Sequence, residues 1–475
     1  MRVRTPPPAL SYHDPMTATT PPALASASKW RRVLGLALPA LAQQLLLLTI
    51  QLYDQYLAGF FTDAHTAALN TANYLYWAAS SYTVLVSVGA TALVARFVGA
   101  TDYKLANRAA GQALVLAVVC GVAAAVAGLL WLDPFVRLLG LRDEAAAYAV
   151  EYLRPLVVLL PFYVVEIGGI ACLVGAGDTR TGLAALAGVV AVNVPLAWVL
   201  AHGPLGFVGI AWGTGISHTL GGLFVLGVLA VGRYGLRLSV ANLVPDLALL
   251  YRLLRVSVPA AVDSLSTAAG QMWFLAIVNA LGNVAASAHG IAIRVEALGY
   301  LSGVAFATAA MSLVGQNLGA RQPGHAARDA WTAFAAGCAL MSLMGAVFYV
   351  FAPGLMAAFA PETNRGEVIA AGVPALRLVA FAMPAVAAVI IVTAALRGAG
   401  DTRVPVAITW AGFLLVRIPL AYLLTGTDVS FWFWVVPGFD LGLLGAWWAM
   451  FADLYLRAGL LVARFASGKW KTIRV

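Results

Sequence analysis

An acidic residue interrupts the first long apolar stretch of the sequence. Asp54 lies near the end of the apolar run over residues 33–60, with Gln44, Gln51 and Gln55 at helical spacing around it. An ionised carboxylate inside a membrane costs at least about 2.5–3.5 kcal/mol, so its presence requires a reason. Burial favours the protonated form of a carboxylic acid, and carboxylate oxygens also suit Na⁺. Asp54 is therefore a candidate for binding and releasing a proton or a sodium ion, and the alternative is an Asp locked to a neighbouring helix.

A second polar stripe lies in a later apolar run. Asp263, Thr267 and Gln271 follow at i, i+4 and i+8, which places them on one face of a helix. They are candidates for a second cation site or for binding a cationic substrate, and the alternative for Asp263 is a structural hydrogen-bond acceptor. Arg417 also falls in an apolar run and is expected to pair with a carboxylate, either Asp263 or Glu296.

Two further acids stand alone in apolar runs. Glu166 and Glu296 each have two open interpretations, a functional acid or a buried carboxylate whose hydrogen bonds are satisfied. Asp453 and Arg457 are four residues apart, and this spacing on a helix predicts that they pair with each other.

The composition places these residues in a membrane protein. Of 475 residues, 62% are hydrophobic and only 10% are charged, whereas a soluble domain carries roughly 25% charged residues. Runs of about 20 apolar residues, the length needed to cross the bilayer as a helix, recur along the chain, and they exclude a membrane β-barrel. We expect an all-α integral membrane protein of about twelve transmembrane helices. They are predicted at about 33–60, 67–95, 109–132, 148–172, 183–202, 207–231, 255–281, 285–314, 331–352, 369–395, 405–425 and 441–465.

The net charge of +9 follows from membrane topology and does not indicate a nucleic-acid partner. Lys and Arg concentrate in alternate connections and at both termini, and the positive-inside rule then places both termini in the cytoplasm. An even number of spans requires the same arrangement. The expected location is the cell (inner) membrane.

An internal repeat organises the chain. The segment Gly175–Arg180, Gly-Ala-Gly-Asp-Thr-Arg, recurs letter for letter as Gly398–Arg403, and Leu-Pro-Ala at 38–40 matches Val-Pro-Ala at 258–260. Each copy holds six predicted spans, so both enter the membrane from the same side as parallel repeats. This predicts two six-helix bundles related by a pseudo-twofold axis along the membrane normal. Pro39 removes a helical hydrogen bond and is a candidate hinge.

The repeat also sets the expected boundaries and turns. In the repeated hexapeptide, Gly permits positive φ and Asp or Thr can cap the next helix. The predicted parts are a disordered cytoplasmic tail at 1–28, an N-terminal six-helix lobe at 29–232, a cytoplasmic linker at 233–254, a C-terminal six-helix lobe at 255–466 and a cytoplasmic tail at 467–475.

These motifs resemble the multidrug and toxic compound extrusion (MATE) family. The resemblance rests on the repeated Gly-Ala-Gly-Asp-Thr-Arg turn, on Leu313-Val-Gly-Gln-Asn-Leu-Gly-Ala320 and on Ala288-His-Gly-Ile-Ala292, and it covers almost the whole chain after residue 30. It implies a cation-coupled antiporter, driven by H⁺ or Na⁺, that exports amphipathic and often cationic compounds through two lobes in alternating access.

The resemblance also implies roles for single residues. Asp54 is placed like an Asp in the first helix of the family that is tied to the coupling cation, and Asn193 is similar to an Asn that accompanies it. The family often carries a second Asp four residues later, where this chain has Ala197. That departure leaves H⁺ and Na⁺ open, with Na⁺ held at Asp54 and Asn193 and Thr214 as a further oxygen ligand.

Other classes of protein fit the sequence less well. A flippase for lipid-linked saccharides shares the broad architecture, but it would be expected to have fourteen spans and several central basic residues, and here mainly Arg294 and Arg417 qualify. An enzyme or receptor is not favoured, because no nucleophile–base pair, metal motif or appended domain appears and Cys120, Cys172 and Cys338 lack metal-ligand spacing. We expect no catalytic residues, no cofactor beyond the coupling ion, small organic substrates and a monomer.

Overall fold

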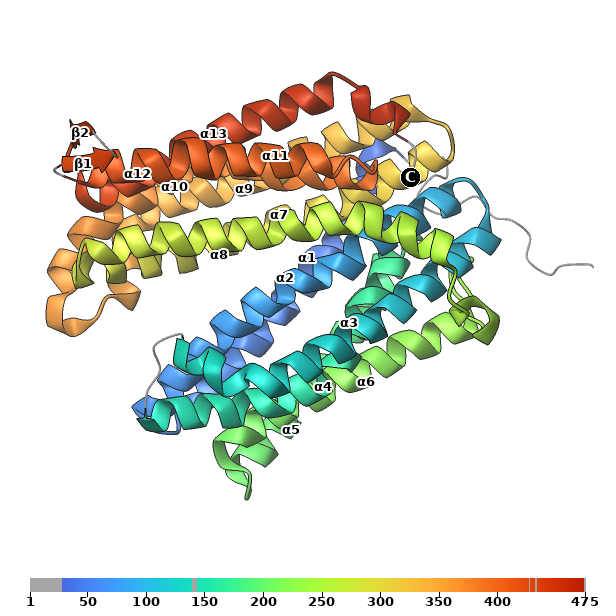
Figure 1. The fold of residues 1–475 in the computed structure, drawn as a ribbon, viewed down its shortest axis with the longest axis horizontal. Coiled ribbons are helices and arrows are strands. Elements are labelled where there is room, and N and C mark those ends of the chain that lie inside the picture. The colour runs from blue at the N-terminus through green and yellow to red at the C-terminus, as the bar shows by residue number, and fades with distance from the viewer. Residues whose placement is uncertain (1–27, 139–142, 427, 432–433, 474–475) are drawn as a thin grey trace, which may run out of the picture.

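The structure, a computed structural model, describes residues 28–138, 143–426, 428–431 and 434–473. The predicted disordered tail at 1–28 lies outside these ranges except for Ser28. The described chain is almost entirely helical, apart from a hairpin of β1 (Asp428–Phe431) and β2 (Trp434–Pro437) that the all-α prediction omits. The α-helices, labelled in Figure 1, are α1 (Lys29–Ala58), α2 (Asp63–Gly99), α3 (Tyr103–Leu138), α4 (Asp143–Gly175), α5 (Thr179–His202), α6 (Gly206–Val231), α7 (Leu247–Ala280), α8 (Asn283–Gly319), α9 (Pro323–Phe359), α10 (Arg365–Gly398), α11 (Arg403–Ala411), α12 (Ile418–Thr425) and α13 (Gly442–Ala466).

These helices provide twelve crossings. Within the described ranges, eleven helical segments are long and apolar enough to span a membrane, and α11, a π-helical turn at Gly412–Arg417 and α12 together form one of them. α13 is not among the eleven, because Asp453 and Arg457 lower its mean hydropathy. It is nevertheless 25 residues long, enough for a crossing, and it packs along α10 and α12. The predicted all-α membrane fold of about twelve helices is confirmed.

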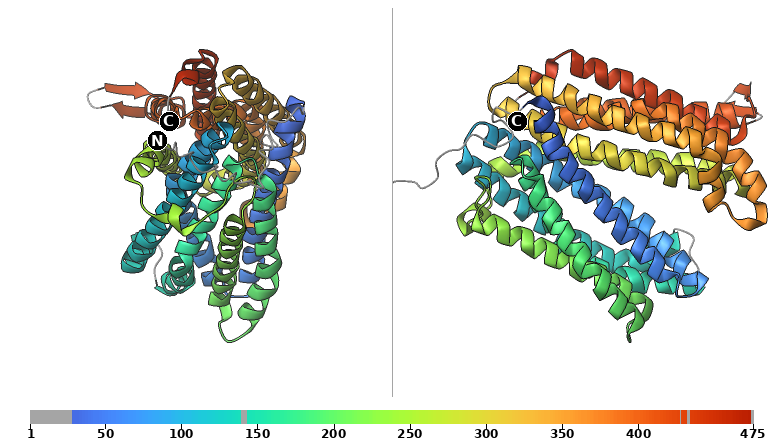
Figure 2. Two further views of the ribbon diagram at one scale, coloured as in Figure 1. Left: turned by 90° about the vertical axis from the view of Figure 1, so that its right-hand side faces the viewer. Right: turned by 180° about the vertical axis from the view of Figure 1, so that it is seen from behind.

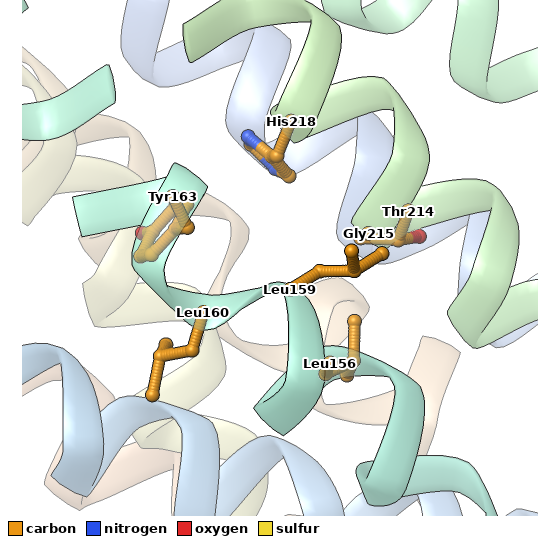
Figure 3. Close-up of a pocket in the computed structure, with 7 residues that line it drawn as sticks. All are labelled: Leu156, Leu159, Leu160, Tyr163, Thr214, Gly215 and His218. Atoms are coloured by element: carbon orange, nitrogen blue, oxygen red, sulfur yellow. The ribbon is translucent and has the colours of Figure 1, made fainter. Parts of the chain in front are cut away.

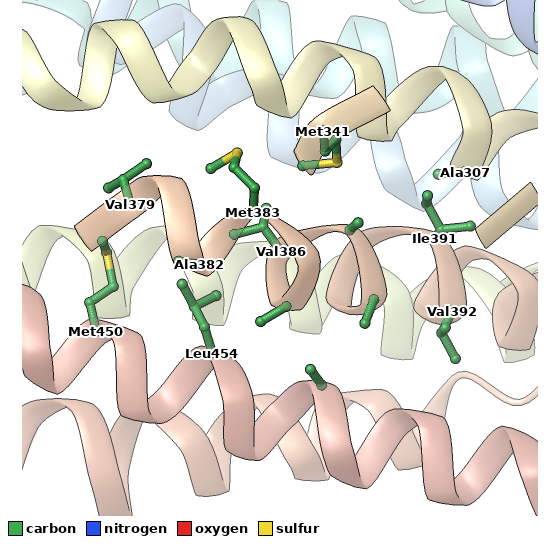
Figure 4. Close-up of a cluster of buried hydrophobic side chains, with 14 of the residues drawn as sticks. Ala307, Met341, Val379, Ala382, Met383, Val386, Ile391, Val392, Met450 and Leu454 are labelled. Atoms are coloured by element: carbon green, nitrogen blue, oxygen red, sulfur yellow. The ribbon is translucent and has the colours of Figure 1, made fainter. Parts of the chain in front are cut away.

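Two lobes, α1–α6 and α7–α13, each bury their own apolar core. In the second lobe, α10 is the central helix, and its residues Val379, Met383 and Ile391 pack among α8, α9 and α13 (Figure 4). The first lobe has two apolar clusters, which lie at different heights along α2, α4 and α6. The ribbons of the lobes converge at the end that holds the C-terminal segment and diverge toward the opposite end (Figures 1 and 2). We call these the terminus end and the far end.

The first helix of each lobe begins in the core of the other lobe. Val33 and Leu36, near the start of α1, are buried in the core of the second lobe, whereas Leu57, near its end, is buried in the first. In α7 the order is reversed, since Leu253 packs in the first lobe and Phe274 in the second. The two helices therefore cross between the lobes, as a pseudo-twofold relation requires.

The prolines of the repeat lie within these crossing helices. Pro39 in α1 and Pro259 in α7 each follow the segment that is packed in the opposite lobe. The pattern of buried and exposed residues over 31–40 recurs over 251–260 at every position but one, since Arg32 is half-buried and Arg252 is exposed. The duplication seen in the sequence thus extends to the environment of the side chains along this stretch.

At the terminus end, α2 and α8 meet backbone to backbone. A Cβ atom added to Gly99 would overlap the carbonyl of Gln316, and one added to Gly319 would overlap the carbonyl of Arg96. Only glycine permits this approach from both sides. Ser312 adds a hydrogen bond of 2.6 Å from its hydroxyl to the carbonyl of Val174 in the first lobe.

The chain segments outside the lobes pack on this same end. α7 begins at Leu247, inside the segment predicted as a linker, and Gln112 holds the preceding loop by donating to the carbonyls of Asn242 (2.9 Å) and Val244 (2.8 Å). In the C-terminal segment, the ring of Trp470 is buried, and the carbonyl of Ile473 accepts a hydrogen bond from Arg96 at 2.8 Å. These segments therefore add to the closure of the terminus end.

This packing predicts that Gly319→Val loosens the terminus end. The added methyl groups meet the α2 backbone, and overpacking of this kind costs about 1–3 kcal/mol. The measurement is the rate at which a thiol reagent labels Cys introduced at the buried Ser312, in a chain freed of its native cysteines; the rate is expected to rise severalfold. Gly35→Val, at a glycine whose side faces open space, is the control. Equal labelling in both variants would show that the contact does not hold the lobes together.

Candidate functional site

Asp54 lies in the far half of α1 and faces α6 within the first lobe. Its side chain is buried, and its Oδ2 accepts a hydrogen bond of 3.0 Å from the hydroxyl of Thr214. Thr214 in turn accepts a hydrogen bond of 3.0 Å from the amide nitrogen of Asn193, on α5. Three helices thus bring the three residues predicted as a cation site into one hydrogen-bonded chain.

Two oxygens of this chain are left without a donor. Oδ1 of Asp54 and Oδ1 of Asn193 are both buried, and neither has a hydrogen-bond partner among the described residues. A buried acceptor without a donor is costly, and such groups normally have partners. Together with the Thr214 hydroxyl, they offer oxygen ligands, the kind that Na⁺ prefers, while a proton on Asp54 would neutralise the same site.

Close packing of α5 on α6 fixes this geometry. A Cβ added to Gly213 would lie 2.7 Å from the Cα of Ala197, so α6 approaches α5 at the residue next to Thr214. Ala197 is fully buried there, and the position at which the resemblance implied a second Asp has no room for a longer side chain. The hydroxyl of Tyr53 donates to the carbonyl of Val194 at 3.0 Å and joins α1 to α5.

The glutamines predicted around Asp54 do not form one polar lining. Gln51 is exposed, and Gln44 and Gln55 are partly buried. Instead Gln43, one residue away from the predicted set, is buried and donates to the carbonyl of Thr179 at 2.7 Å. It joins α1 to the start of α5 and has a structural role.

In the second lobe, the predicted polar residues are mostly held by fixed partners. Asp263 is buried and pairs with Arg397 of α10 at 2.7 Å. Gln271 accepts a hydrogen bond of 2.9 Å from Arg417. Thr267 is partly buried and has no side-chain hydrogen bond within the described chain. The polar stripe of α7 is therefore divided between an ion pair and a hydrogen bond to a second arginine.

The predicted pairing of Arg417 with Asp263 or Glu296 is wrong. Its guanidinium pairs with Asp453 of α13 at 2.8 Å, and Arg457 pairs with the same oxygen at 2.7 Å, which confirms the predicted Asp453–Arg457 pair. Asp453 is fully buried and so accepts from both arginines. The central carbons of the Arg417 and Arg457 guanidinium groups lie 4.5 and 4.9 Å from the centre of the Phe413 ring.

Glu296 is an acid in a membrane helix of the second lobe that has no fixed partner among the described residues. It is partly buried and has neither a hydrogen bond nor an ion pair within the described chain, although it lies near enough to feel the charge of Arg417. A cationic group could approach it without displacing a protein donor. It remains a candidate for contact with a charged substrate.

The first lobe also contains a buried histidine–carboxylate pair that the sequence did not indicate. Nδ1 of His218 lies 2.8 Å from Oε2 of Glu166, and both side chains are buried. His218 follows Thr214 by one helical turn on α6, and both line a small pocket with leucines and Tyr163 of α4 (Figure 3). The helical spacing of Thr214 and His218 was the available signal, but the partner of His218 is 52 positions away in sequence.

The lobes thus differ in what their polar groups can do. Both lobes contain buried oxygens without a donor, but the carboxylates Asp263 and Asp453 of the second lobe are held by arginines, whereas Asp54 of the first has no arginine partner among the described residues. No group of three or more His, Cys, Asp or Glu side chains positioned for a metal ion occurs within the described residues. Two membrane-embedded lobes with crossing helices between them are the architecture of a membrane transporter, a class that works by moving one lobe against the other.

Comparison with known proteins identifies the family. The MatE family model matches residues 39–199 and 259–423, one match in each lobe, and the chain belongs to this family, whose members are transporters and not enzymes. It is 27% identical to the "Probable multidrug resistance protein NorM" of Thermotoga maritima, over 93% of each chain.

Solved structures show the same fold. A "MOP superfamily transporter from Pyrococcus furiosus" superposes with a TM-score of 0.86 at 20% identity, covering 93% of this chain and 97% of that one. A structure described as the "Outward-facing conformation of a multidrug resistance MATE family transporter of the MOP superfamily" gives a TM-score of 0.84 at 21% identity, with the same coverage. The resemblance drawn from the sequence motifs is confirmed.

The network around Asp453 predicts a large loss of stability in Asp453→Asn. Removing one charge leaves Arg417 and Arg457 buried without a counter-ion, and breaking a buried pair costs about 3–5 kcal/mol. Thermal unfolding of the purified protein is expected to move to a clearly lower temperature. Asp133→Asn, which removes a carboxylate from an exposed i, i+4 pair with Arg137, is the control and should change little. Similar shifts in both variants would contradict a structural role for the buried network.

Proposed function

We propose that the chain is a cation-coupled antiporter that exports amphipathic, often cationic organic compounds by alternating access. The observation that carries the proposal is the buried group of Asp54, Asn193 and Thr214, with two oxygens that lack donors. Either H⁺ or Na⁺ bound there would offset the free-energy cost of burying those oxygens without a donor. The multidrug-resistance names of several relatives support small organic compounds as substrates.

The proposed orientation places the terminus end in the cytoplasm. The connections at that end carry most of the Lys and Arg residues, which favours the inside of a bacterial inner membrane. In this orientation the lobes are closed toward the cytoplasm and diverge outward. Asp54, in the far half of α1, is then nearer the outside, from which a driving cation arrives.

Exchange follows from competition between two states of the lobes. Cation binding at Asp54 favours one arrangement of α1, α5 and α6, and the substrate leaves from the state for which the substrate has the lower affinity.

A membrane potential contributes about 2.3 kcal/mol per charge per 100 mV, enough for roughly a fortyfold gradient of a neutral substrate. Glu296, unpaired in the second lobe, is the proposed contact for cationic substrates.

The flippase alternative gains no support from the arginines. A site for a lipid-linked pyrophosphate needs cationic side chains that are free to bind it. Of the two arginines that the sequence singled out, Arg417 is occupied by Asp453 and Gln271. Arg294 is exposed and has no ion pair within the described chain, and one such arginine falls short of the several that the site would need. The protein is proposed to work as a monomer, without a cofactor beyond the coupling ion.

The first test is Asp54→Asn in proteoliposomes loaded with a fluorescent organic cation. Sodium and proton gradients are imposed separately, which also identifies the coupling ion. The variant is expected to lose the acceleration that a gradient gives to the wild-type protein, because its amide cannot neutralise a cation. Glu367→Gln, an exposed acid on α10, should transport normally. Gradient-driven efflux at the wild-type rate in Asp54→Asn would refute the site.

The second test concerns Pro39 as the hinge of α1. Pro39→Ala is expected to restore one backbone hydrogen bond, worth about 1 kcal/mol, and so to slow exchange about fivefold if the helix bends there. The rate of gradient-driven efflux is compared with that of Pro353→Ala, a proline inside α9, a helix that remains within one lobe. Unchanged transport in Pro39→Ala would place the bend elsewhere.

A further inference from the structure

The His218–Glu166 pair lies deep in the first lobe and has no part in the exchange described above. Glu166 is fully buried and His218 nearly so. One carboxylate oxygen, Oε2, lies 2.8 Å from the imidazole, and the other, Oε1, is buried without a hydrogen-bond partner. A Cβ added to Gly221 would lie 2.7 Å from Oε1, so the backbone of α6 packs directly on the carboxyl group.

No arginine or lysine neutralises this carboxyl group in the part of the chain that the structure describes. His218 is the only ion-pair partner of Glu166 there. Two other titratable groups are close to the pair. Asp54 on α1 feels the charge of His218, and the ring of Tyr163 on α4 meets His218 edge to face at 5.1 Å. Tyr82 on α2 and Cys120 on α3 lie beyond them, where Tyr82 interacts with Tyr163 and Cys120.

The number of protons on the pair follows from its burial. A carboxylate with a neutral imidazole carries charge −1, and the same pair with one added proton is neutral, whether the proton resides on oxygen or on nitrogen. An uncompensated charge inside a membrane protein is costly. The pair is therefore most stable with one dissociable proton, and losing that proton leaves Oε1 charged with no donor.

The electrostatics of Asp54 are linked to those of the pair. Asp54 feels the charge of His218, and Thr214, which donates to Asp54, lies one turn before His218 on the same helix. When a metal ion occupies ionised Asp54, a positive imidazole nearby is disfavoured. When Asp54 is ionised and empty, the same positive charge is favoured.

We propose that His218 and Glu166 form a second proton-binding site, distinct from Asp54, whose occupancy is linked to the occupancy of Asp54. The pair takes its dissociable proton up from water and returns it to water, so its charge changes between 0 and −1. An ionised and empty Asp54 favours the protonated pair, and a metal ion at Asp54 disfavours it. The linkage rests on the proposed cation site at Asp54, whereas the existence of the proton site does not.

The test is infrared spectroscopy of the full-length protein reconstituted in lipid, as the difference between acidic and alkaline buffer. The wild-type protein is expected to show a pH-dependent carboxyl signal that remains in Asp54→Asn. Glu166→Gln should lose that signal, equivalent to one carboxyl group per transporter. His218→Asn, which keeps the carboxyl group, should change its frequency and the pH at which it appears. Glu144→Gln, an exposed acid at the start of α4, is the matched control and should keep the signal.

Two results would overturn the proposal. Identical pH-difference spectra for the wild-type protein and Glu166→Gln would show that the carboxyl group never changes its proton, so that the pair only holds α4 to α6. A Glu166-dependent signal with the same pH midpoint in wild type and Asp54→Asn would refute the linkage. If Glu166→Gln does not fold, the pH-difference spectra of His218→Asn and the wild-type protein are compared instead, and identical spectra would refute the proposal. Failure of gradient-driven transport in the wild-type protein would refute the antiport proposal and leave this spectral result unaffected.

Discussion

A carboxylate inside an apolar, membrane-embedded protein needs a positive charge, a donor or a proton, and this requirement separates the acids of this transporter by role. Asp453 is held by two arginines and Asp263 by one, so their charges are compensated within the protein. Asp54 receives one hydrogen bond from a hydroxyl group and has no ion-pair partner among the residues that the structure describes. Burying the ionised Asp54 without a compensating charge costs free energy, and a bound cation removes that cost. This gain in free energy drives cation binding.

The duplicated architecture supplies the motion that such a site would control. The starts of α1 and α7 are buried in the opposite lobe, and their ends are buried in their own. A change at Asp54, near the end of α1, is therefore transmitted along a helix whose beginning is fixed elsewhere, with Pro39 between the two. Arg32 anchors that beginning by pairing with the buried Asp329 of α9 at 2.7 Å. Rigid packing at both ends of one helix is a direct way to couple a small site to the movement of a lobe.

The fold was predictable because it depends on features that are local in sequence. Apolar length identifies membrane helices, and the repeated hexapeptide identifies the duplication. In its two copies, Gly177 and Gly400 adopt φ of 89° and 87°, and Asp178 accepts from the backbone nitrogen of Thr181 at 3.0 Å, as a helix cap does. Each Asp also pairs with an arginine, but the partners differ: Asp178 pairs with Arg233, just after α6, at 3.1 Å, and Asp401 pairs with Arg464 of α13 at 2.8 Å. Which donor a repeated Asp finds depends on helices that are distant in sequence.

The partners of buried charges were less predictable for the same reason. Spacing of four residues correctly indicated Asp453 with Arg457, but no local pattern indicates that Arg417 shares the same oxygen. The pair of Glu166 with His218 joins α4 to α6, and the ion pair of Asp263 with Arg397 joins α7 to α10. These contacts are decided by how helices rotate against one another, which apolar periodicity leaves undetermined. Asp54, Asn193 and Thr214 could be grouped because the family resemblance supplied two of the three positions.

The most direct test of the account is a distance between the lobes as a function of cation. Spin labels on cysteines introduced at Pro204, between α5 and α6, and at Asn283, at the start of α8, report the separation of the lobes at the far end by electron–electron double resonance. Adding Na⁺, or lowering the pH, is expected to shift the distance distribution in the otherwise wild-type chain and to leave it unchanged in Asp54→Asn. The same shift in both proteins would show that the lobes respond to the cation without Asp54, and would contradict the account.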